Sequence, residues 1–240
     1  MREKINIGFT NKSFKEDNLF IQEININEFN HKINYQILSK LNFVPKLLKN
    51  SSNEMIWEYI DGSDVELNQQ NLKIIAQNVS TLHNSNLEFP QYNIDKRIKK
   101  YIEIIEKKNI DLPFIRQNYP LIEKITSECD KSTPNHNDLW TRNMIKKDQQ
   151  IFIVDWEYAT MNDKHFDLAY FICSSHLNEE QEKWFLQNYD DEIDYKQLLK
   201  QKLVVYYIVV LWVLAQDTKF FDETPYIQLF NQTKELIKRA

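Results

Sequence analysis

The sequence predicts an α+β fold in which a small β-rich lobe, residues 1–61, precedes a larger α-helical lobe, residues 62–240. Short segments of β-forming residues between turn residues fill the first part, which is typical of a small sheet. Apolar residues recur every three or four positions through most of the second part, which is typical of packed helices. The pair Asp61-Gly62 lies where one pattern replaces the other.

The β-rich lobe is expected to contain five strands and one helix. Apolar positions at helical spacing predict the helix over about residues 28–41, and Pro45 ends that pattern. Turn residues at 16–18 and 50–53 separate neighbouring strands. The predicted strands cover residues 5–9, 12–15, 18–24, 46–48 and 54–60.

The α-helical lobe begins with an amphipathic helix, marked by apolar residues between Leu72 and Leu82. A loop at residues 135–143 and a hairpin at 144–154, which turns at Lys147-Asp148, interrupt the helices. The other predicted helices lie near residues 93–108, near 116–130, and from about 166 onward.

Composition argues against several classes of protein. A formal net charge of −5 does not suit a nucleic-acid-binding face, and the two cysteines do not have the spacing of a zinc site or a disulfide scaffold. The first twelve residues contain no apolar signal core. The strongest apolar run, residues 203–215, is too short to cross a bilayer and predicts a buried core helix. We therefore expect a cytoplasmic protein with no membrane span.

The strongest chemical signal is His136-x-Asp138-x4-Asn143, followed by Asp155 after the predicted hairpin. Phosphoryl transfer needs a carboxylate to orient and deprotonate the attacking hydroxyl, and oxygen ligands to hold Mg²⁺ on the phosphates. Asp138 is the candidate base, and Asn143 and Asp155 are the candidate metal ligands. The hairpin is expected to bring Asp155 back beside the loop, whose backbone His136 would fix.

The alternative is that Asp and Asn, which are common in loops, have this spacing by chance. The context favours a site, because the loop, the hairpin and an acidic residue after the apolar strand IFIV follow one another in the required order. The sequence therefore predicts a phosphotransferase that uses ATP and Mg²⁺.

Two segments within residues 136–171, HNDLWTRNMI and IFIVDWEYATMNDKHFDLAYF, resemble the bacterial choline kinases of the aminoglycoside phosphotransferase and choline/ethanolamine kinase superfamily. The run DWEYATMNDKHFDLA is the most specific part. GFTNKSF, VPKLL, EYIDG and LKIIAQNVSTLH are similar, in order, to the family's nucleotide loop, a strand, the hinge and the next helix. The resemblance implies a protein-kinase-like two-lobed fold and transfer of the ATP γ-phosphate to a small-molecule alcohol.

The resemblance also implies where the nucleotide binds. The adenine is expected to bond the hinge backbone around residues 58–60, and the only two glycines, Gly8 and Gly62, lie in the nucleotide loop and just beyond the hinge. The candidate nucleotide-binding residues are Thr10, Asn11, Lys12, Gln22, Glu58 and Ile60.

The chain departs from the family pattern on the third strand. The Lys or Arg that holds the α- and β-phosphates aligns with Gln22, which can donate a hydrogen bond but has no charge. Lys12 or Lys15 could substitute for it. The partner glutamate is either Glu28 or is replaced by His31. A catalytically silent nucleotide-binding protein is therefore the alternative to an active enzyme.

The acceptor is predicted to be choline or a related amino-alcohol. Tyr158 and Trp212 match positions of the family's aromatic cage for a quaternary ammonium, although Trp212 could equally pack in the core. A second tryptophan and a carboxylate of the family align with Ala215 and Ser174. Ethanolamine, thiamine, an aminoglycoside or a sugar are the alternative acceptors. Nothing in the sequence indicates an oligomeric state.

Other polar residues are expected to be structural. By resemblance, Asp167 braces the catalytic loop from the start of a helix, although a role as helix N-cap would also explain it. His83 is interpreted as a packing residue at a helix end, and His165 as a surface residue. The basic residues between positions 96 and 100 are interpreted as a solvated helix face.

Overall fold

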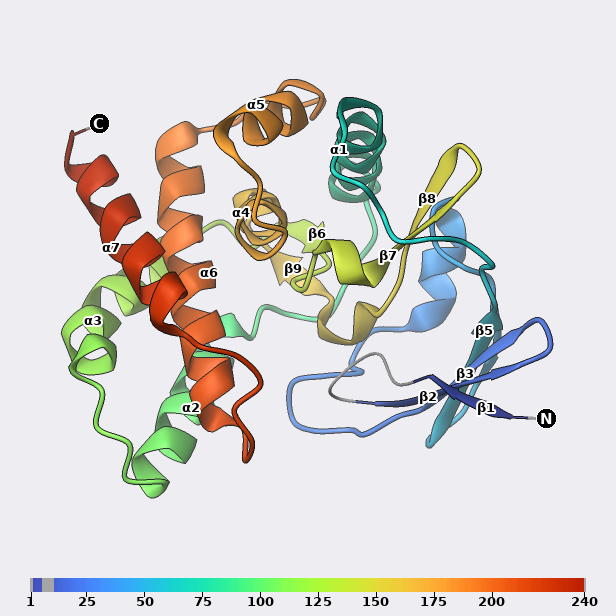
Figure 1. Cartoon of the computed structure of the whole chain (residues 1–240), viewed down its shortest axis with the longest axis horizontal. Helices are drawn as coiled ribbons and strands as arrows, with labels where there is room; N and C mark the ends of the chain where they lie inside the picture. The colour runs from blue at the N-terminus through green and yellow to red at the C-terminus, as the bar shows by residue number, and fades with distance from the viewer. Residues whose placement is uncertain (1, 6–10, 240) are drawn as a thin grey trace.

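The computed structural model describes residues 2–5 and 11–239, and it has the two-lobed α+β fold that the sequence predicts. Figure 1 shows the small sheet on one side of the molecule and most of the helices on the other. The boundary between residues 61 and 62 stays a prediction. Gly8 and Thr10 lie outside the described residues.

The N-terminal sheet has the strand order β1-β2-β3-β5-β4, and all neighbouring strands are antiparallel. Its central strand is β3, in which Gln22 is paired with Ser13 on one side and Met55 on the other. Side chains alternate between the two faces of a strand, so Gln22 faces a cavity while Ile21 is buried on the other face. The strands are β1 (Glu3–Ile5), β2 (Lys12–Glu16), β3 (Leu19–Glu23), β4 (Leu47–Asn50) and β5 (Glu54–Glu58).

The helix predicted over residues 28–41 is wrong for most of its length. Only Tyr35–Lys40 is helical, and it is a short 3₁₀ helix, η1. Just before it, the Asn27 side-chain oxygen accepts hydrogen bonds from the backbone amides of Phe29 and Asn30, at 2.7 and 3.1 Å. Asparagine side chains that bond nearby backbone groups compete with helix formation. This competition overrides the apolar spacing.

Four helices, α2, α3, α4 and α7, pack against α6, whereas α1 packs against α5. Polar caps set several helix starts: the side chains of Asn68 and Asn178 accept hydrogen bonds from the first turns of α1 and α5. The predicted helices are therefore confirmed. They are α1 (Gln69–His83), α2 (Ile94–Lys107), α3 (Pro113–Glu128), α4 (Lys164–Ser174), α5 (Glu179–Gln187), α6 (Tyr195–Ala215) and α7 (Thr224–Arg239).

Helix α6 is longer than its apolar run predicts, because it starts at Tyr195 after the N-cap Asp194. At 21 residues it has the length and mean hydropathy of a membrane span, so the length argument drawn from the sequence was wrong. Burial is the better criterion here, since 78% of its apolar window is buried within the described structure. In this fold α6 is the core helix.

Two short two-stranded sheets position the loop between α3 and α4. The β7–β8 hairpin was predicted, whereas the β6–β9 pair was not, because its strands are short and far apart in the chain. Single 3₁₀ turns, η2 and η3, precede the hairpin and follow it. These elements are β6 (Thr133–Asn135), η2 (Thr141–Asn143), β7 (Met144–Lys147), β8 (Gln150–Ile153), η3 (Trp156–Tyr158) and β9 (Thr160–Asn162).

Candidate active site

A cavity of about 710 Å³ is lined by residues of both the sheet and the helical lobe. This volume is in the range of small-molecule binding sites. Gln22 and Ile60 line it on the sheet side, and Asp138, Asp155 and Tyr170 line it on the helical side. The fold therefore brings together residues from distant parts of the chain around one space.

The side chain of Asp138 is held from two sides. Its Oδ1 accepts a hydrogen bond from the Tyr170 hydroxyl at 2.5 Å, and its Oδ2 accepts one from the Asn143 amide at 2.9 Å. Burial raises the pKa of Asp138 above its ordinary value, although the hydrogen bond from Tyr170 acts in the opposite direction. A fixed carboxylate with increased proton affinity suits a general base.

Asn143 connects the loop to the hairpin. Its amide nitrogen also donates to the backbone oxygen of Asp138 at 2.9 Å, which leaves the side-chain oxygen for another partner. The backbone carbonyl oxygen of Asn143 accepts a hydrogen bond from the backbone amide of Val154 at 2.9 Å. This bond closes the end of the hairpin onto the loop, so that Asp155 lines the same cavity as Asn143.

Asp155 has a left-handed backbone conformation, with φ 64° and ψ 56°, which is uncommon outside glycine and often found at ligand sites. The pKa of its carboxyl is raised well above the ordinary value, first by burial and then by the charges of Glu157 and Asp138. The Gln22 amide lies 3.5 Å from its Oδ1. Three neighbouring acidic side chains therefore concentrate negative charge here.

Asn143 and Asp155 fit the requirements of Mg²⁺, because both supply the oxygen ligands that it prefers. In phosphoryl-transfer sites Mg²⁺ takes few protein oxygens and completes its shell with phosphate and water. Within the described part of the chain, no group of three or more His, Cys, Asp or Glu side chains is suited to a metal. The donor set and the local negative charge thus fit a divalent cation shared with nucleotide phosphates.

Asp167, in α4, is hydrogen-bonded to the loop that precedes the hairpin. It accepts hydrogen bonds from the backbone amides of His136 and Asn137, at 2.7 and 2.8 Å. The N-cap of α4 is Asp163, so the alternative role of Asp167 as the cap is wrong. His83 lies 3.4 Å from Asp167, which gives it a contact that a simple packing residue would lack.

Two further histidines are buried. His136 bonds the carbonyl oxygen of Val154 through Nε2 at 2.9 Å, and this contact ties the loop to the hairpin. His165 was expected at the surface, but it is only 7% exposed. Its Nδ1 lies 2.7 Å from the carboxylate of Asp163, because both residues belong to the enclosed start of α4.

Glu157, which is not among the residues predicted from the sequence, also lines the cavity. It is 3% exposed, and its Oε2 lies 3.1 Å from the Asn11 amide, 3.0 Å from the Asn30 amide and 3.0 Å from His31 Nε2. Its three partners precede β4, whereas Glu157 follows the hairpin. The carboxylate therefore joins the two lobes beside Asp155. In the sequence, the second acidic residue of the run DWE, two positions after Asp155, indicates that Glu157 could belong to the same site.

The nucleotide side of the cavity differs in part from expectation. Lys12 is exposed on β2, and the Lys15 ammonium lies 4.1 Å from the centroid of the Tyr59 ring. Neither lysine lines the cavity, although Tyr59 does, so a role for Lys15 in place of the charge that Gln22 lacks stays a prediction. The predicted nucleotide-binding residues that do line the cavity are Asn11, Gln22, Glu58 and Ile60.

The two candidates for the partner glutamate position, Glu28 and His31, lie in different surroundings. Glu28 forms a surface ion pair with Lys100 at 3.0 Å. His31 instead lies against Glu157 and contacts Tyr35 through Nδ1 at 2.7 Å. His31 thus pairs with an acidic residue that follows the hairpin, whereas Gln22 contacts Asp155.

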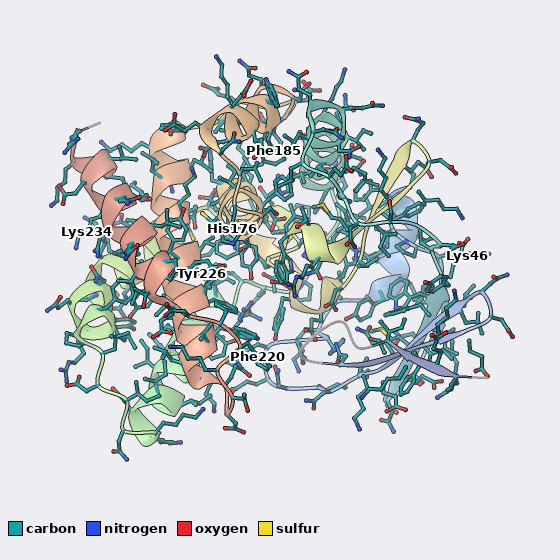
Figure 2. The ribbon with its side chains drawn as sticks, viewed as in Figure 1. Lys46, His176, Phe185, Phe220, Tyr226 and Lys234 are labelled. Carbon is teal, nitrogen blue, oxygen red and sulfur yellow. The ribbon has the colours of Figure 1, made fainter. Side chains whose placement is uncertain are left out.

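Aromatic side chains of the helical lobe line the cavity near Asp138. Trp212 stacks on Phe220, with ring centroids 5.5 Å apart, so it both packs against a neighbour and lines the cavity. Figure 2 shows Phe220 and Tyr226 near the connection between α6 and α7. The aromatic residues of this side are Trp140, Tyr158, Tyr170, Trp212, Phe221 and Tyr226.

Arg97 is buried, whereas the charge pattern of its helix predicts a solvated face. It is 5% exposed and lines the cavity, with its guanidinium carbon 4.2 Å from the centroid of the Tyr158 ring. It follows the buried Ile94 by one turn of α2 and precedes the buried Ile98. Its position on that apolar stripe was a signal for burial.

The fold is protein-kinase-like. A choline/ethanolamine kinase family protein from Mesorhizobium loti has a similar structure, with a TM-score of 0.79 and 21% identity, covering 99% of this chain and 88% of that one. The choline kinase LicA from Streptococcus pneumoniae has a TM-score of 0.74 and 20% identity, and the match covers 99% of this chain and 94% of LicA. A structure of LicA in complex with AMP gives 0.73. These likenesses concern the fold.

Sequence similarity identifies the family. A sequence model of the choline/ethanolamine kinase family matches residues 22–234. A LicA homologue from Mycoplasma capricolum is 45% identical over 228 residues, covering 93% of this chain and 95% of that protein. The chain therefore belongs to the choline/ethanolamine kinase family, which makes it a kinase that phosphorylates an alcohol.

Proposed function

We propose that this kinase transfers the γ-phosphate of ATP to the hydroxyl of a small amino-alcohol, with choline as the first candidate. The observation that supports the proposal best is the position of Asp138. Asn143 and Tyr170 hold its carboxylate where the sheet side and the aromatic side of the cavity meet. A base at that point can reach a hydroxyl that faces a bound nucleotide.

In this proposal Asp138 orients the acceptor hydroxyl and takes its proton as the oxygen attacks the γ-phosphorus. The bond between that phosphorus and its bridging oxygen breaks, and ADP leaves with the bridging oxygen. Asn143 and Asp155 would hold Mg²⁺, whose charge balances that of the phosphates when it is bound. His136 and Asp167 keep the loop in place without touching the reacting atoms.

The hinge supports a specific way of binding the adenine. The backbone amides of Glu58 and Tyr59 already donate to the carbonyl oxygens of Lys46 and Asn18, at 2.9 and 2.8 Å. They are therefore engaged within the sheet lobe. We expect the adenine to be recognised through the backbone at Ile60, which also lines the cavity.

The aromatic side of the cavity supports an amino-alcohol as acceptor. The faces of aromatic rings attract quaternary ammonium groups, and Tyr158 and Trp212 both line this side. The two cysteines are buried and free, which fits the cytoplasmic location that we propose.

A catalytically silent nucleotide-binding protein is the second candidate, and Gln22 favours it. Gln22 lies on β3, the central strand of the sheet, and approaches Asp155 with a neutral amide. A neutral donor binds phosphate oxygens less strongly than a lysine or an arginine. Both candidates bind Mg-ATP, and only turnover distinguishes them.

The test is Mg-ATP consumption by the purified protein with a panel of acceptors that includes choline, ethanolamine, thiamine, an aminoglycoside and a sugar. Asp138→Asn should lower kcat about 10²- to 10⁴-fold, because it removes the base, and should leave ATP affinity nearly unchanged. Wild-type turnover by Asp138→Asn would remove this residue from the base role. ATP binding without turnover on any acceptor would favour the silent protein.

A further inference from the structure

A buried cation lies in the wall of the cavity on the acceptor side. Arg97 is 5% exposed, and its Nε and Nη1 atoms are buried with no hydrogen-bond partner. Its guanidinium carbon lies 4.2 Å from the centroid of the Tyr158 ring and 5.9 Å from that of Tyr101. These rings offer only cation–π contact, which does not satisfy the N–H donors.

Among the described residues no acidic side chain forms an ion pair with Arg97, although the charge of Asp138 acts on it and raises its pKa. Asp138 is bonded to Asn143 and Tyr170, and Glu157 is bonded to residues of the sheet lobe. Burying an unpaired guanidinium destabilises a protein unless a partner of opposite charge arrives. The burial of Arg97 therefore indicates a role in binding.

Other donors lie unpaired in the same wall. Trp140 Nε1 and Ser174 Oγ are buried without hydrogen-bond partners and line the cavity. Ser174 follows Tyr170 by one turn of α4, so both side chains share one helix face. A wall with a cation and unpaired donors suits a ligand with anionic oxygens.

We propose that Arg97 forms an anion subsite beside Asp138, which binds the oxygens of a phosphate or carboxylate group carried by the phosphorylated product or by the acceptor. The proposal deepens the proposed function, since it concerns the acceptor side of the same cavity. A guanidinium presents paired N–H donors that match the oxygens of either group.

This subsite has a consequence for the aromatic cage. The guanidinium of Arg97 occupies one face of Tyr158, the ring that was predicted to bind a quaternary ammonium. A cationic ligand at that face must displace the guanidinium of Arg97 or bind in spite of repulsion by its positive charge. Removing the charge should therefore weaken the binding of anions and strengthen the binding of cations.

The experiment titrates the full chain with inorganic phosphate and, separately, with tetramethylammonium, using Arg97→Gln and the wild type. Phosphate affinity should fall at least about tenfold in Arg97→Gln, as expected for a lost charge-assisted contact, while tetramethylammonium affinity should rise. Saturating ADP in a parallel titration removes phosphate binding on the nucleotide side. Equal phosphate affinity in both proteins would overturn the proposal.

The matched control is Arg116→Gln, because Arg116 is an exposed arginine that pairs with Asp111 away from the cavity. It should bind both probes like the wild type. Arg97→Lys, which keeps the charge but loses the planar donor array, should retain part of the phosphate affinity.

Thermal unfolding separates a binding role from a structural one. Arg97→Met keeps much of the side-chain volume and removes an unpaired buried charge, so its Tm should equal or exceed that of the wild type. A Tm lower by more than about 4 °C, which corresponds to about 1 kcal/mol or more in a chain of this size, would show that Arg97 stabilises the fold and would contradict the proposal.

Turnover identifies the source of the anionic group. If the phosphoryl group is the ligand, Arg97→Gln lowers kcat with every acceptor that the wild type uses. If the acceptor supplies a carboxylate, Arg97→Gln impairs the use of serine but not of choline. Absence of turnover in the wild type would count against the phosphotransferase, while the phosphate titration would still decide the role of Arg97.

Discussion

Tyr170 tunes the proposed base at the scale of single residues. Its hydroxyl donates to Asp138 Oδ1 at 2.5 Å, and this bond favours the charged carboxylate. Burial acts in the opposite direction and has the larger effect, so the pKa of Asp138 is raised. A base works only when it is deprotonated, so activity should be present above this pKa and should be lost as the pH falls through it.

Tyr170→Phe should therefore move the acid limb of the kcat/KM profile to higher pH. The substitution removes the hydrogen bond that lowers the pKa of Asp138 and leaves burial in place. Steady-state kinetics from pH 5 to 9, about the range in which proteins stay folded, would measure the shift. The matched control is Tyr119→Phe, whose hydroxyl bonds Glu123 on the surface of α3. An unchanged limb in Tyr170→Phe would contradict this account of Asp138.

At the scale of elements, the β7–β8 hairpin is held against the segment that follows β5. The backbones of Ser63 and Lys146 exchange two hydrogen bonds, each of 2.9 Å. Gly62 makes this approach possible, because a Cβ atom there would lie 2.4 Å from the carbonyl oxygen of Lys146 and 2.7 Å from Cγ2 of Ile145. One glycine thus sets the distance between the hinge and the hairpin that carries Asp155.

Gly62→Ala should lower the free energy of unfolding by about 1–3 kcal/mol, because the added methyl group forces the two backbones apart. Urea unfolding followed by circular dichroism measures the change. Ser63→Ala is the matched control, since it keeps the backbone bonds of the bridge and should unfold like the wild type. Equal stability of Gly62→Ala and the wild type would mean that the contact relaxes without cost.

At the scale of the whole molecule, Glu157 connects the two lobes next to the proposed metal ligands. Asn11, Asn30 and His31 all approach its Oε2 atom, and the His31 amide also donates to its backbone oxygen at 2.7 Å. A buried carboxylate with several donors is costly to remove, because the donors then lose their partner. This contact therefore couples the order of residues 25–34 to that of the hairpin.

Glu157→Ala should lower the free energy of unfolding by about 2–4 kcal/mol, because it leaves several buried donors unpaired. It should also speed amide hydrogen exchange in residues 25–34, which mass spectrometry can follow. Glu157→Gln keeps an acceptor oxygen and should have a smaller effect. Exchange in this segment at the wild-type rate in Glu157→Ala would show that the lobes are held together by other contacts.

The sequence by itself determined the features that depend on neighbouring residues. The period of apolar residues predicts α1, α2 and α3 and a helical region from about residue 166 onward, and the spacing of Asp138, Asn143 and Asp155 around a hairpin predicts one site. Such patterns act over a few residues, where the geometry of a turn or a helix face is local. The family resemblance also rests on such a run, DWEYATMNDKHFDLA.

Only the tertiary structure decided which side chains meet across the chain. It places Arg97 in the cavity wall, puts His31 against Glu157 and leaves Lys12 exposed, and it replaces a predicted helix by a short 3₁₀ turn. These outcomes depend on contacts between residues far apart in the sequence. Burial and charge pairing are properties of the packed molecule, so local spacing cannot determine them.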